Sequence, residues 1–185
     1  MLSVCVPHSG RWRYFSRCAE TVRASATAAG CKYELVVADY QVGDPARDLP
    51  SVFGGVVVRP EGKFTRGGAR NAAAAAAKGD ILFFLDADML CVPKLFERGM
   101  KIARDGKVFL PLYDFEGLDG KLHPGNGTGN LFISRALWDK STKFIEKDEW
   151  GGEDTCFTHQ FRAAGLNVRE KIDGFIHQYH GRDEQ

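Results

Sequence analysis

Residues 81–88, ILFFLDAD, join a run of five apolar residues to Asp86 and Asp88. Side chains two positions apart on an extended chain point the same way. Two like charges so placed both stay ionised only beside a cation. Carboxylate oxygens suit magnesium or manganese, which commonly take further ligands from water and a bound phosphate. The pair predicts a divalent metal site; the alternative is that Asp88 caps the next helix and Asp86 meets an arginine.

A second group of polar residues lies in the segment WGGED, residues 150–154. Gly151 and Gly152 allow the backbone to approach a bulky ligand closely. Glu153 and Asp154 begin a predicted helix, where carboxylates also complement the helix dipole without any further role. Near the end of the chain, HQYH places two histidines close together, which in most proteins are surface or partly packed side chains.

The composition limits the class of protein. The chain has 185 residues, of which 44% are hydrophobic and 26% charged, and its formal net charge is +1. This predicts one globular domain without a general basic field for nucleic acid. No run reaches the roughly 20 apolar residues that span a membrane, and MLSVCVP lacks the features of a signal peptide. Five scattered cysteines favour reduced thiols and a cytoplasmic location.

The elements that must position these residues alternate along the chain. Apolar runs predict strands at residues 2–7, 33–39, 55–59 and 81–86, and later at 107–114, 129–135 and 168–172. Helical spacing predicts helices at 12–29, 66–79, 93–104 and 153–165, with loops at 40–54 and 117–129. This alternation, with strands apolar on both faces, predicts an α/β domain with a mostly parallel central sheet. The carboxyl ends of its strands are the expected ligand-binding edge.

The segment TRGGARNAAAAAAKGDILFFLDADML resembles the central segment of family 2 glycosyltransferases and their relatives. These enzymes have the GT-A fold, a Rossmann-like three-layer sandwich. The matching residues are Arg70, Asn71, Gly79, Asp80, Asp86 and Asp88. The resemblance implies that Asp88 binds the metal of a nucleotide-sugar diphosphate and that Asp86 contacts the ribose or the metal. It also implies that Arg66 or Arg70 faces the donor.

The later segments GNLFISR and WGGEDTCFTHQFRAAG resemble the C-terminal half of β-1,4-galactosyltransferases and of bacterial chondroitin-polymerase-like enzymes. This resemblance implies that Asp154 is the general base for an acceptor hydroxyl. It implies that Glu153 holds the acceptor and that Trp150 forms a wall for sugar rings. Gly152 and Asn130 belong to the same substrate side.

Both ends of the chain contribute to the site that the resemblance implies. In the resembled families a histidine after the last strand completes the metal shell, and His180 fits this place slightly better than His177. At the front, VCVPH matches the strand end where the nucleotide pocket begins. Pro7 and His8 would border the base, and Asp39 would meet the uracil or ribose.

The expected protein is therefore a single GT-A domain over residues 1–185, with a nucleotide-sugar half (1–90) and an acceptor and catalytic half (91–185). The expected activity is inverting transfer, dependent on Mn²⁺ or Mg²⁺, from a nucleotide sugar, most simply UDP-linked. The acceptor hydroxyl would belong to a glycan, a protein, a lipid-linked sugar or a hydroxylated DNA base. Two alternatives are a sugar nucleotidyltransferase, which should carry a glycine-rich loop where PHSGRW stands, and a nucleotide-sugar-binding module without turnover.

Overall fold

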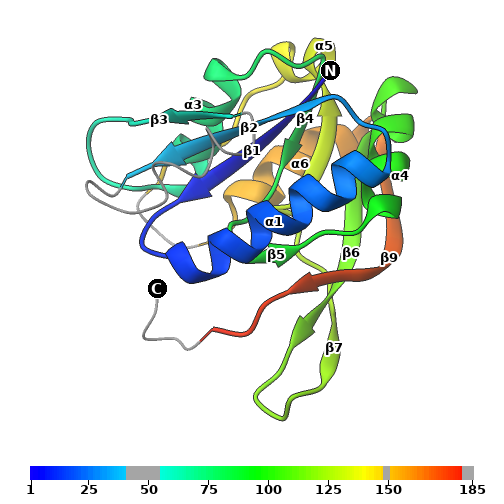
Figure 1. Cartoon of the computed structure of the whole chain (residues 1–185). Helices are drawn as coiled ribbons and strands as arrows, with labels where there is room; N and C mark the ends of the chain where they lie inside the picture. Colours follow the sequence, from blue (N-terminus) through cyan, green and yellow to red (C-terminus); the bar gives the residue numbers. More distant parts are fainter. Residues whose placement is uncertain (41–54, 148–150, 181–185) are drawn as a thin grey trace.

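A computed structural model describes residues 1–40, 55–147 and 151–180. Its strands form one nine-stranded sheet (Figure 1). The spatial order is β3 (Val56–Val58), β2 (Tyr33–Asp39), β1 (Leu2–His8), β4 (Ile81–Phe84), β8 (Leu131–Ser134), β6 (Val108–Glu116), β9 (Asn167–His177) and β5 (Met89–Leu90), with β7 (Leu122–Gly125) paired to β6.

The direction of the strands explains where the site forms. Strands β1, β2, β3, β4, β6 and β9 all run the same way, whereas β8, β5 and β7 run in reverse. The carboxyl ends of the six codirectional strands therefore meet at one edge of the sheet, which is where ligands bind in α/β folds. The mostly parallel sheet predicted from the sequence is confirmed.

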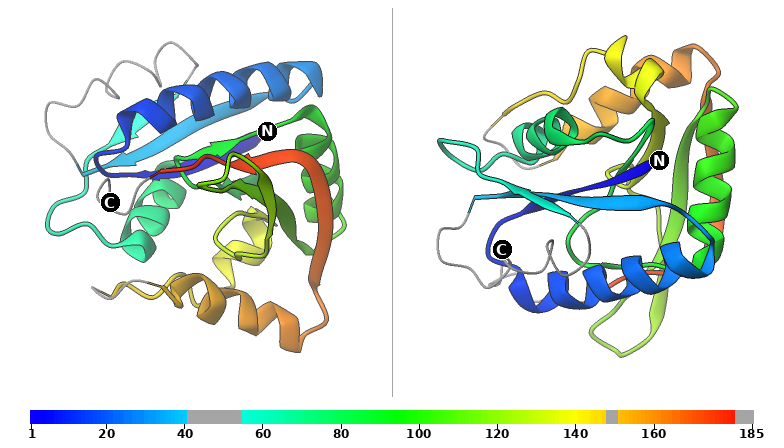
Figure 2. Two further views of the ribbon diagram at one scale, coloured as in Figure 1. Left: turned by 90° about the horizontal axis from the view of Figure 1, so that it is seen from below. Right: turned by 45° about the horizontal axis from the view of Figure 1, so that its top comes forward.

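Helices cover both faces of this sheet, which gives the predicted three layers (Figure 2). One face packs against α1 (Trp12–Ala28) and α4 (Pro93–Arg104), and the other against α3 (Arg66–Ala76), α5 (Arg135–Asp139) and α6 (Glu153–Ala163). The alanine run lies in α3, whose small side chains Ala69, Ala73 and Ala74 are buried against the sheet. In the described residues, no helix is both long and apolar enough to cross a lipid bilayer.

Aromatic side chains fill the core on each face of the sheet. On the face of α1 and α4, the ring of Phe132 stacks on Phe83 with 3.8 Å between centroids, and Phe96 meets both rings edge-on. On the other face, Phe144 stacks on Phe157 at 4.2 Å. Since β4 is buried on both faces, its continuous apolar sequence contributes to both cores.

Four features of the fold differ from the sequence-based expectation. Strand β5 has two residues and α5 has five, too few to show a periodicity. Strand β7 lies in the expected loop 117–129. Strand β9 continues to His177 across a register irregularity near Gly174, whose φ is +80°, although the pattern predicted its end at residue 172. Of the expected loop 40–54, residues 41–54 lie outside the described residues.

The stacked pair on the α1 and α4 face gives a stability prediction. Phe132→Ala should lower the free energy of unfolding by about 3–5 kcal/mol, because it removes a fully buried ring and leaves a cavity. The measurement is urea denaturation followed by circular dichroism. Phe115→Ala is the matched control, since this ring is 39% exposed on β6, and it should change stability by less than about 1 kcal/mol. Equal losses in the two variants would contradict this account of the core.

Candidate active site

A cavity of about 660 Å³ opens at the edge where the codirectional strands end. Its walls come from the ends of β1, β4, β6 and β9 and from the first turns of α1, α3 and α6. Most of the predicted site residues lie on them, joined by Arg11, Phe64, Tyr113 and several small residues. The lining consists of Pro7, Ser9, Arg11, Phe64, Arg66, Arg70, Asp86, Ala87, Asp88, Tyr113, Gly127, Gly129, Asn130, Gly151, Gly152, Glu153, Asp154, His177 and His180.

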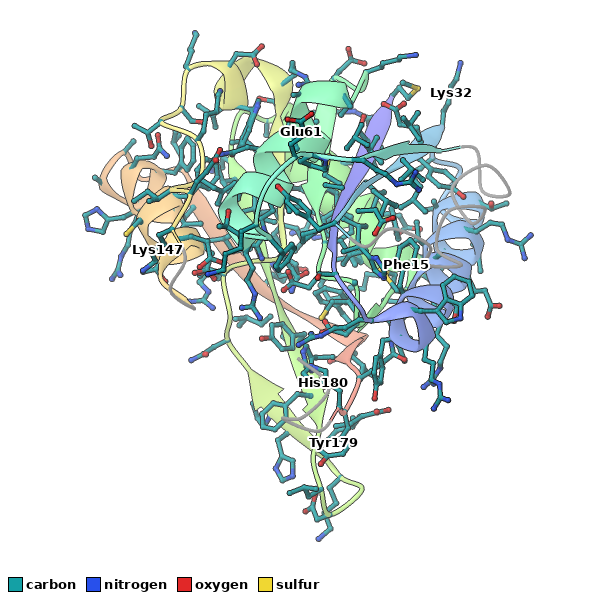
Figure 3. The ribbon with its side chains drawn as sticks, turned by 90° about the vertical axis from the view of Figure 1, so that its left-hand side faces the viewer. Phe15, Lys32, Glu61, Lys147, Tyr179 and His180 are labelled. Atoms are coloured by element: carbon teal, nitrogen blue, oxygen red, sulfur yellow. The ribbon has the colours of Figure 1, made fainter. Side chains whose placement is uncertain are left out.

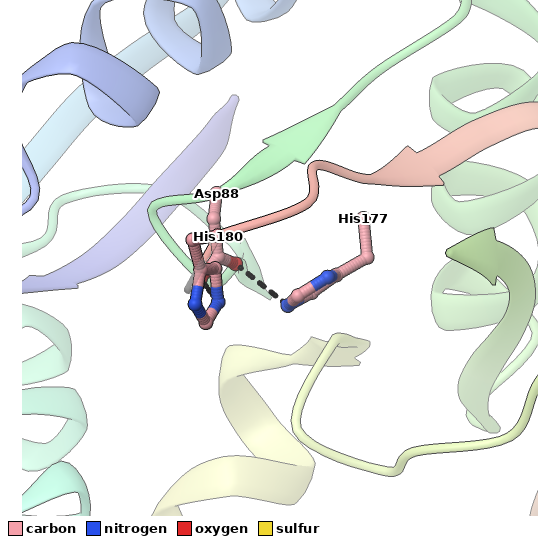
Figure 4. A group of neighbouring side chains, drawn as sticks. All are labelled: Asp88, His177 and His180. Atoms are coloured by element: carbon pink, nitrogen blue, oxygen red, sulfur yellow. Dashed lines mark ion pairs between the residues drawn. The ribbon is translucent and has the colours of Figure 1, made fainter. Parts of the chain in front are cut away.

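Asp88 is the most enclosed carboxylate of the cavity, with a side chain 2% exposed. Its Oδ1 lies 3.5 Å from His177 Nε2, and its Oδ2 lies 3.3 Å from His180 Nε2 (Figure 4). Arg11 Nη1 donates a hydrogen bond to the same Oδ2. Within the described residues, Asp88, His177 and His180 form a group whose potential ligand atoms all lie within 4.8 Å of one another. The predicted neighbourhood of Asp88 and both histidines is thus present.

The pairing of β5 with β9 brings these residues together. Met89 lies opposite His177 in this antiparallel pair, and the Gln178 amide then donates to the Asp88 carbonyl at 2.9 Å. The buried Gln178 side chain donates to the Tyr14 carbonyl at 3.2 Å, and the Tyr14 ring meets His180 edge-on. Figure 3 shows His180 and Tyr179 at the base of the β6–β7 hairpin. Residues 178–180 are therefore held between Asp88 and α1.

The electrostatics of this group favour an ionised carboxylate. Burial alone would raise the pKa of Asp88, but His180, His177 and the charge of Arg11 outweigh it and lower the pKa from 3.8 to about 2. The Asp88 Oδ1 atom is buried and has no hydrogen-bond partner among the described residues. An anionic oxygen in this position, with two imidazoles beside it, is a donor set that fits a divalent cation.

Asp86 points to a different partner from Asp88. Arg70 Nη2 donates to Asp86 Oδ1 at 2.7 Å, and Arg70 Nη1 donates to Glu153 Oε1 at 2.9 Å. The Arg70 side chain is 2% exposed. Burial lowers its pKa, but the charges of Asp86 and Glu153 raise it more, so the guanidinium stays charged. Asp86 thus meets an arginine, which was the alternative considered for it, and its predicted contact with ribose or metal stays a prediction.

Space for this bridge comes from the segment before β8. A Cβ atom on Gly129 would lie 2.6 Å from Arg70 Nη2 and 3.2 Å from Asp86 Oδ2, which no side chain could occupy without displacing them. Next to it, Asn130 Oδ1 accepts from the Asp86 amide at 2.8 Å. Asn130 therefore fixes the backbone that carries the acidic pair, and its predicted substrate contact stays a prediction.

Asp154 stands in the first turn of α6, beside Glu153. Its Oδ2 accepts from Thr128 Oγ1 at 2.9 Å, and its Oδ1 accepts from the Thr155 amide at 2.7 Å. Gly152 caps this helix with φ +85°, a left-handed conformation that favours glycine. The two neighbouring carboxylates thus differ: Glu153 is buried and paired with Arg70, whereas Asp154 is part-buried and lines the cavity with hydroxyl and amide partners.

Pro7 lines the cavity as expected, whereas His8 and Asp39 are buried and pair with each other. His8 Nδ1 is 3.2 Å from Asp39 Oδ1, and both side chains are fully buried. The two residues are opposite each other in the parallel β1–β2 register, which explains the pair. The cavity lining of the described residues does not include either of them, and their predicted contacts with a nucleotide stay predictions. The predicted wall residue Trp150 lies outside the described residues.

Tyr113 is a cavity residue that sequence reasoning missed. Its ring stacks beside His177, and Gly125 and Gly127 leave room for it, since a Cβ on either would lie within 3 Å of Tyr113. Tyr113 also lines a second hollow of about 380 Å³, which shares His177 and His180 with the first. Its position near the end of a predicted apolar strand, like that of Asp86, could have indicated a place at the ligand-binding edge. The role of Arg11 gave no such signal, because its partner is 77 residues away.

The comparisons with known proteins agree with the fold. The family model described as Glycosyl transferase family 2 matches residues 3–171. Among solved structures, S. aureus TarS 1–349 has a TM-score of 0.75 at 17% identity over 96% of this chain. The same fragment in complex with UDP-GlcNAc has a TM-score of 0.74 at 17% identity over 97% of this chain.

The two TarS chains are longer than this one. The chain spans 60% and 59% of their lengths, respectively. At this level of identity the likeness shows the GT-A fold. No curated protein matches the chain in sequence. The resemblance of residues 129–165 to β-1,4-galactosyltransferases stays a prediction.

The Arg70 bridge yields a prediction about stability. Arg70→Met should lower the free energy of unfolding by about 3–5 kcal/mol, because it leaves the carboxylates of Asp86 and Glu153 without their partner. Adding Glu153→Gln should recover part of this loss, since one uncompensated charge disappears. The measurement is urea denaturation.

A surface arginine supplies the matched control. Arg98 donates to both oxygens of Glu170, but it is part-exposed. Arg98→Met should cost less than about 1 kcal/mol. A loss in Arg70→Met no larger than in Arg98→Met would contradict the bridging role.

Proposed function

Because this chain belongs to glycosyl transferase family 2, we propose that it transfers a sugar from a nucleotide-activated donor to an acceptor hydroxyl, with a divalent metal and with inversion at the anomeric carbon. The observation that carries the proposal is the arrangement of one cavity. Asp88, His177 and His180 lie in it and form the proposed cation site. Asp154 lies in the same cavity and is the proposed base.

The donor is proposed to be a UDP-sugar. Support comes from the solved structures of similar fold, since TarS binds UDP-GlcNAc and UDP in its complexes. The cavity of about 660 Å³ is within the range of small-molecule sites. The residues Pro7, Arg66 and Arg70 on its wall are the proposed contacts of the donor, with the phosphates toward Asp88.

The metal is proposed to be manganese in preference to magnesium. The residues that would hold it are Asp88, His177 and His180, a set of one carboxylate and two imidazoles. Magnesium prefers oxygen ligands, whereas imidazole suits the first-row transition metals. When bound, this ion would supply charge neutralisation for the leaving diphosphate.

The proposed transfer is a single displacement. The Asp154 carboxylate takes the proton of the acceptor hydroxyl, whose oxygen forms a bond to the anomeric carbon. The bond from this carbon to the diphosphate oxygen breaks, and its electron pair leaves with the nucleoside diphosphate. Thr128 and the Thr155 amide hold the carboxylate in place. Arg70 keeps Glu153 paired, so the neighbouring carboxylate is engaged elsewhere.

The acceptor is proposed as a glycan, a protein, a lipid-linked sugar or a hydroxylated DNA base. A screen of these four classes with UDP-sugars, read out as released UDP, tests the function. UDP release with formation of a glycosylated product supports transfer. Release of pyrophosphate from a sugar phosphate and UTP would instead indicate a nucleotidyltransferase, and donor binding without any release would indicate a binding module.

The metal site gives the next prediction. Excess EDTA should abolish UDP release, and Mn²⁺ should restore it more fully than Mg²⁺, because two of the three proposed ligands are imidazoles. Asp88→Asn should remove the response to Mn²⁺. Asp105→Asn, at a surface ion pair with Lys101, is the control and should behave like the wild type. Full activity in excess EDTA would rule out the metal-dependent reaction.

The base gives a separate prediction. Asp154→Asn keeps the size of the side chain but cannot accept the proton, so kcat should fall by roughly 10²- to 10⁴-fold while donor affinity changes little. The product formed from an α-linked donor should be β-linked, which the anomeric proton coupling in an NMR spectrum reports. An α-linked product would overturn the inverting mechanism, and a fully active Asp154→Asn enzyme would mean that another group is the base.

A further inference from the structure

We propose that Arg11 is an exchangeable counter-ion of the metal site: it holds Asp88 in the donor-free protein, releases it when a divalent cation binds, and then faces the donor phosphates. This inference rests on the metal site of the proposed function. It concerns the N-cap residue of α1, which lies outside the group of proposed ligands.

The first observation is that Arg11 competes for a single oxygen. Its Nη1 donates to Asp88 Oδ2, the atom that also lies 3.3 Å from His180 Nε2. A cation bound between Asp88 and the two imidazoles would need this oxygen. A guanidinium kept in direct contact with the same oxygen would repel that cation strongly in a site shielded from water. Occupation of the site by a metal and by Arg11 are therefore alternatives.

The second observation is that Arg11 has little else to hold it. Within the described part of the chain, Asp88 is the one side chain with which the Arg11 guanidinium forms an ion pair. Arg11 stands at the N-cap of α1, where its side chain makes no capping hydrogen bond. Arg70 is different, because it forms ion pairs with two carboxylates. Rotation of the Arg11 side chain thus breaks one contact, whereas movement of Arg70 breaks two.

The third observation is where the released guanidinium would remain. The Arg11 side chain is 15% exposed and lines the cavity. Its helix turn is docked on the proposed ligands, since the neighbouring Tyr14 contacts His180 and accepts from Gln178. A side chain that leaves Asp88 therefore stays beside the metal site. Arginine is well suited to bind a diphosphate there, since its planar guanidinium pairs with phosphate oxygens.

This arrangement predicts two effects of opposite sign from one substitution. Arg11→Gln should tighten Mn²⁺ binding to the donor-free protein by about tenfold, because the competing cation is gone, a factor typical of coupled ligands. The same variant should weaken UDP binding at saturating Mn²⁺ by about tenfold, because a phosphate partner is gone. Damage to the fold would weaken both.

Two measurements on the full chain test the inference. Free Mn²⁺ is counted by electron paramagnetic resonance during titration of the donor-free protein, and UDP binding is measured by calorimetry in saturating Mn²⁺. Arg13→Gln is the matched control, since Arg13 is exposed on the same turn of α1 and its loss changes the net charge equally. Arg13→Gln should leave both affinities unchanged. Arg11→Lys keeps a positive charge, so its Mn²⁺ and UDP affinities should lie between those of the wild type and of Arg11→Gln.

The outcomes separate this inference from the function it rests on. Tighter Mn²⁺ binding with weaker UDP binding in Arg11→Gln, and neither in Arg13→Gln, supports the exchange even if no acceptor is ever glycosylated. Mn²⁺ affinities equal in the wild type, Arg11→Gln and Arg13→Gln overturn the exchange and leave the proposed reaction intact. Failure of both the wild type and Arg11→Gln to bind Mn²⁺ overturns the metal site and the exchange together.

Discussion

The buried guanidinium of Arg70 joins the two carboxylates of Asp86 and Glu153 across the site. Arg70 belongs to α3, Asp86 follows β4, and Glu153 begins α6, so one side chain ties three elements together. The buried Glu153 carboxylate would be costly in the cavity wall without this charge, which the part-exposed Asp86 shares. The absence of a side chain at Gly129 is part of the same constraint, since the bridge needs the space beside Arg70. Asp154 owes its position to this bridge through its neighbour Glu153.

The direction of the strands then decides what else reaches the cavity. Codirectional strands bring Pro7, the acidic pair, Tyr113 and His177 to one edge although these residues are far apart in the chain. Beyond the irregularity near Gly174, β9 pairs with β6 on one side and with β5 on the other at Ile176 and His177, so that the tail passes Asp88. The cavity thus contains two arginines that differ in their ion pairs. Arg70 pairs with two carboxylates, and Arg11 pairs with one.

The sequence was informative where a residue acts through its local pattern. The continuous apolar runs and the alanine-rich helix predicted the α/β layers, and the ILFFLDAD segment predicted acidic side chains at a strand end. It was less informative where the partner is distant. Asp86 pairs with Arg70 and Asp88 pairs with Arg11, and neither pairing follows from spacing along the chain. Short elements such as β5 were missed because two residues carry no period, yet β5 positions His177.

Strand β8 has a consequence for the way this chain can be divided. It lies between β4 and β6 and supplies the hydrogen-bonding partner along one side of β4. A fragment that stops after residue 90 would carry ILFF as an uncovered edge, apolar on both faces and without a charge or proline to interrupt it. Such an edge pairs readily with other chains. Residues 1–90, the predicted nucleotide-sugar half, thus form part of one sheet rather than a separate module, and when separated this fragment should self-associate.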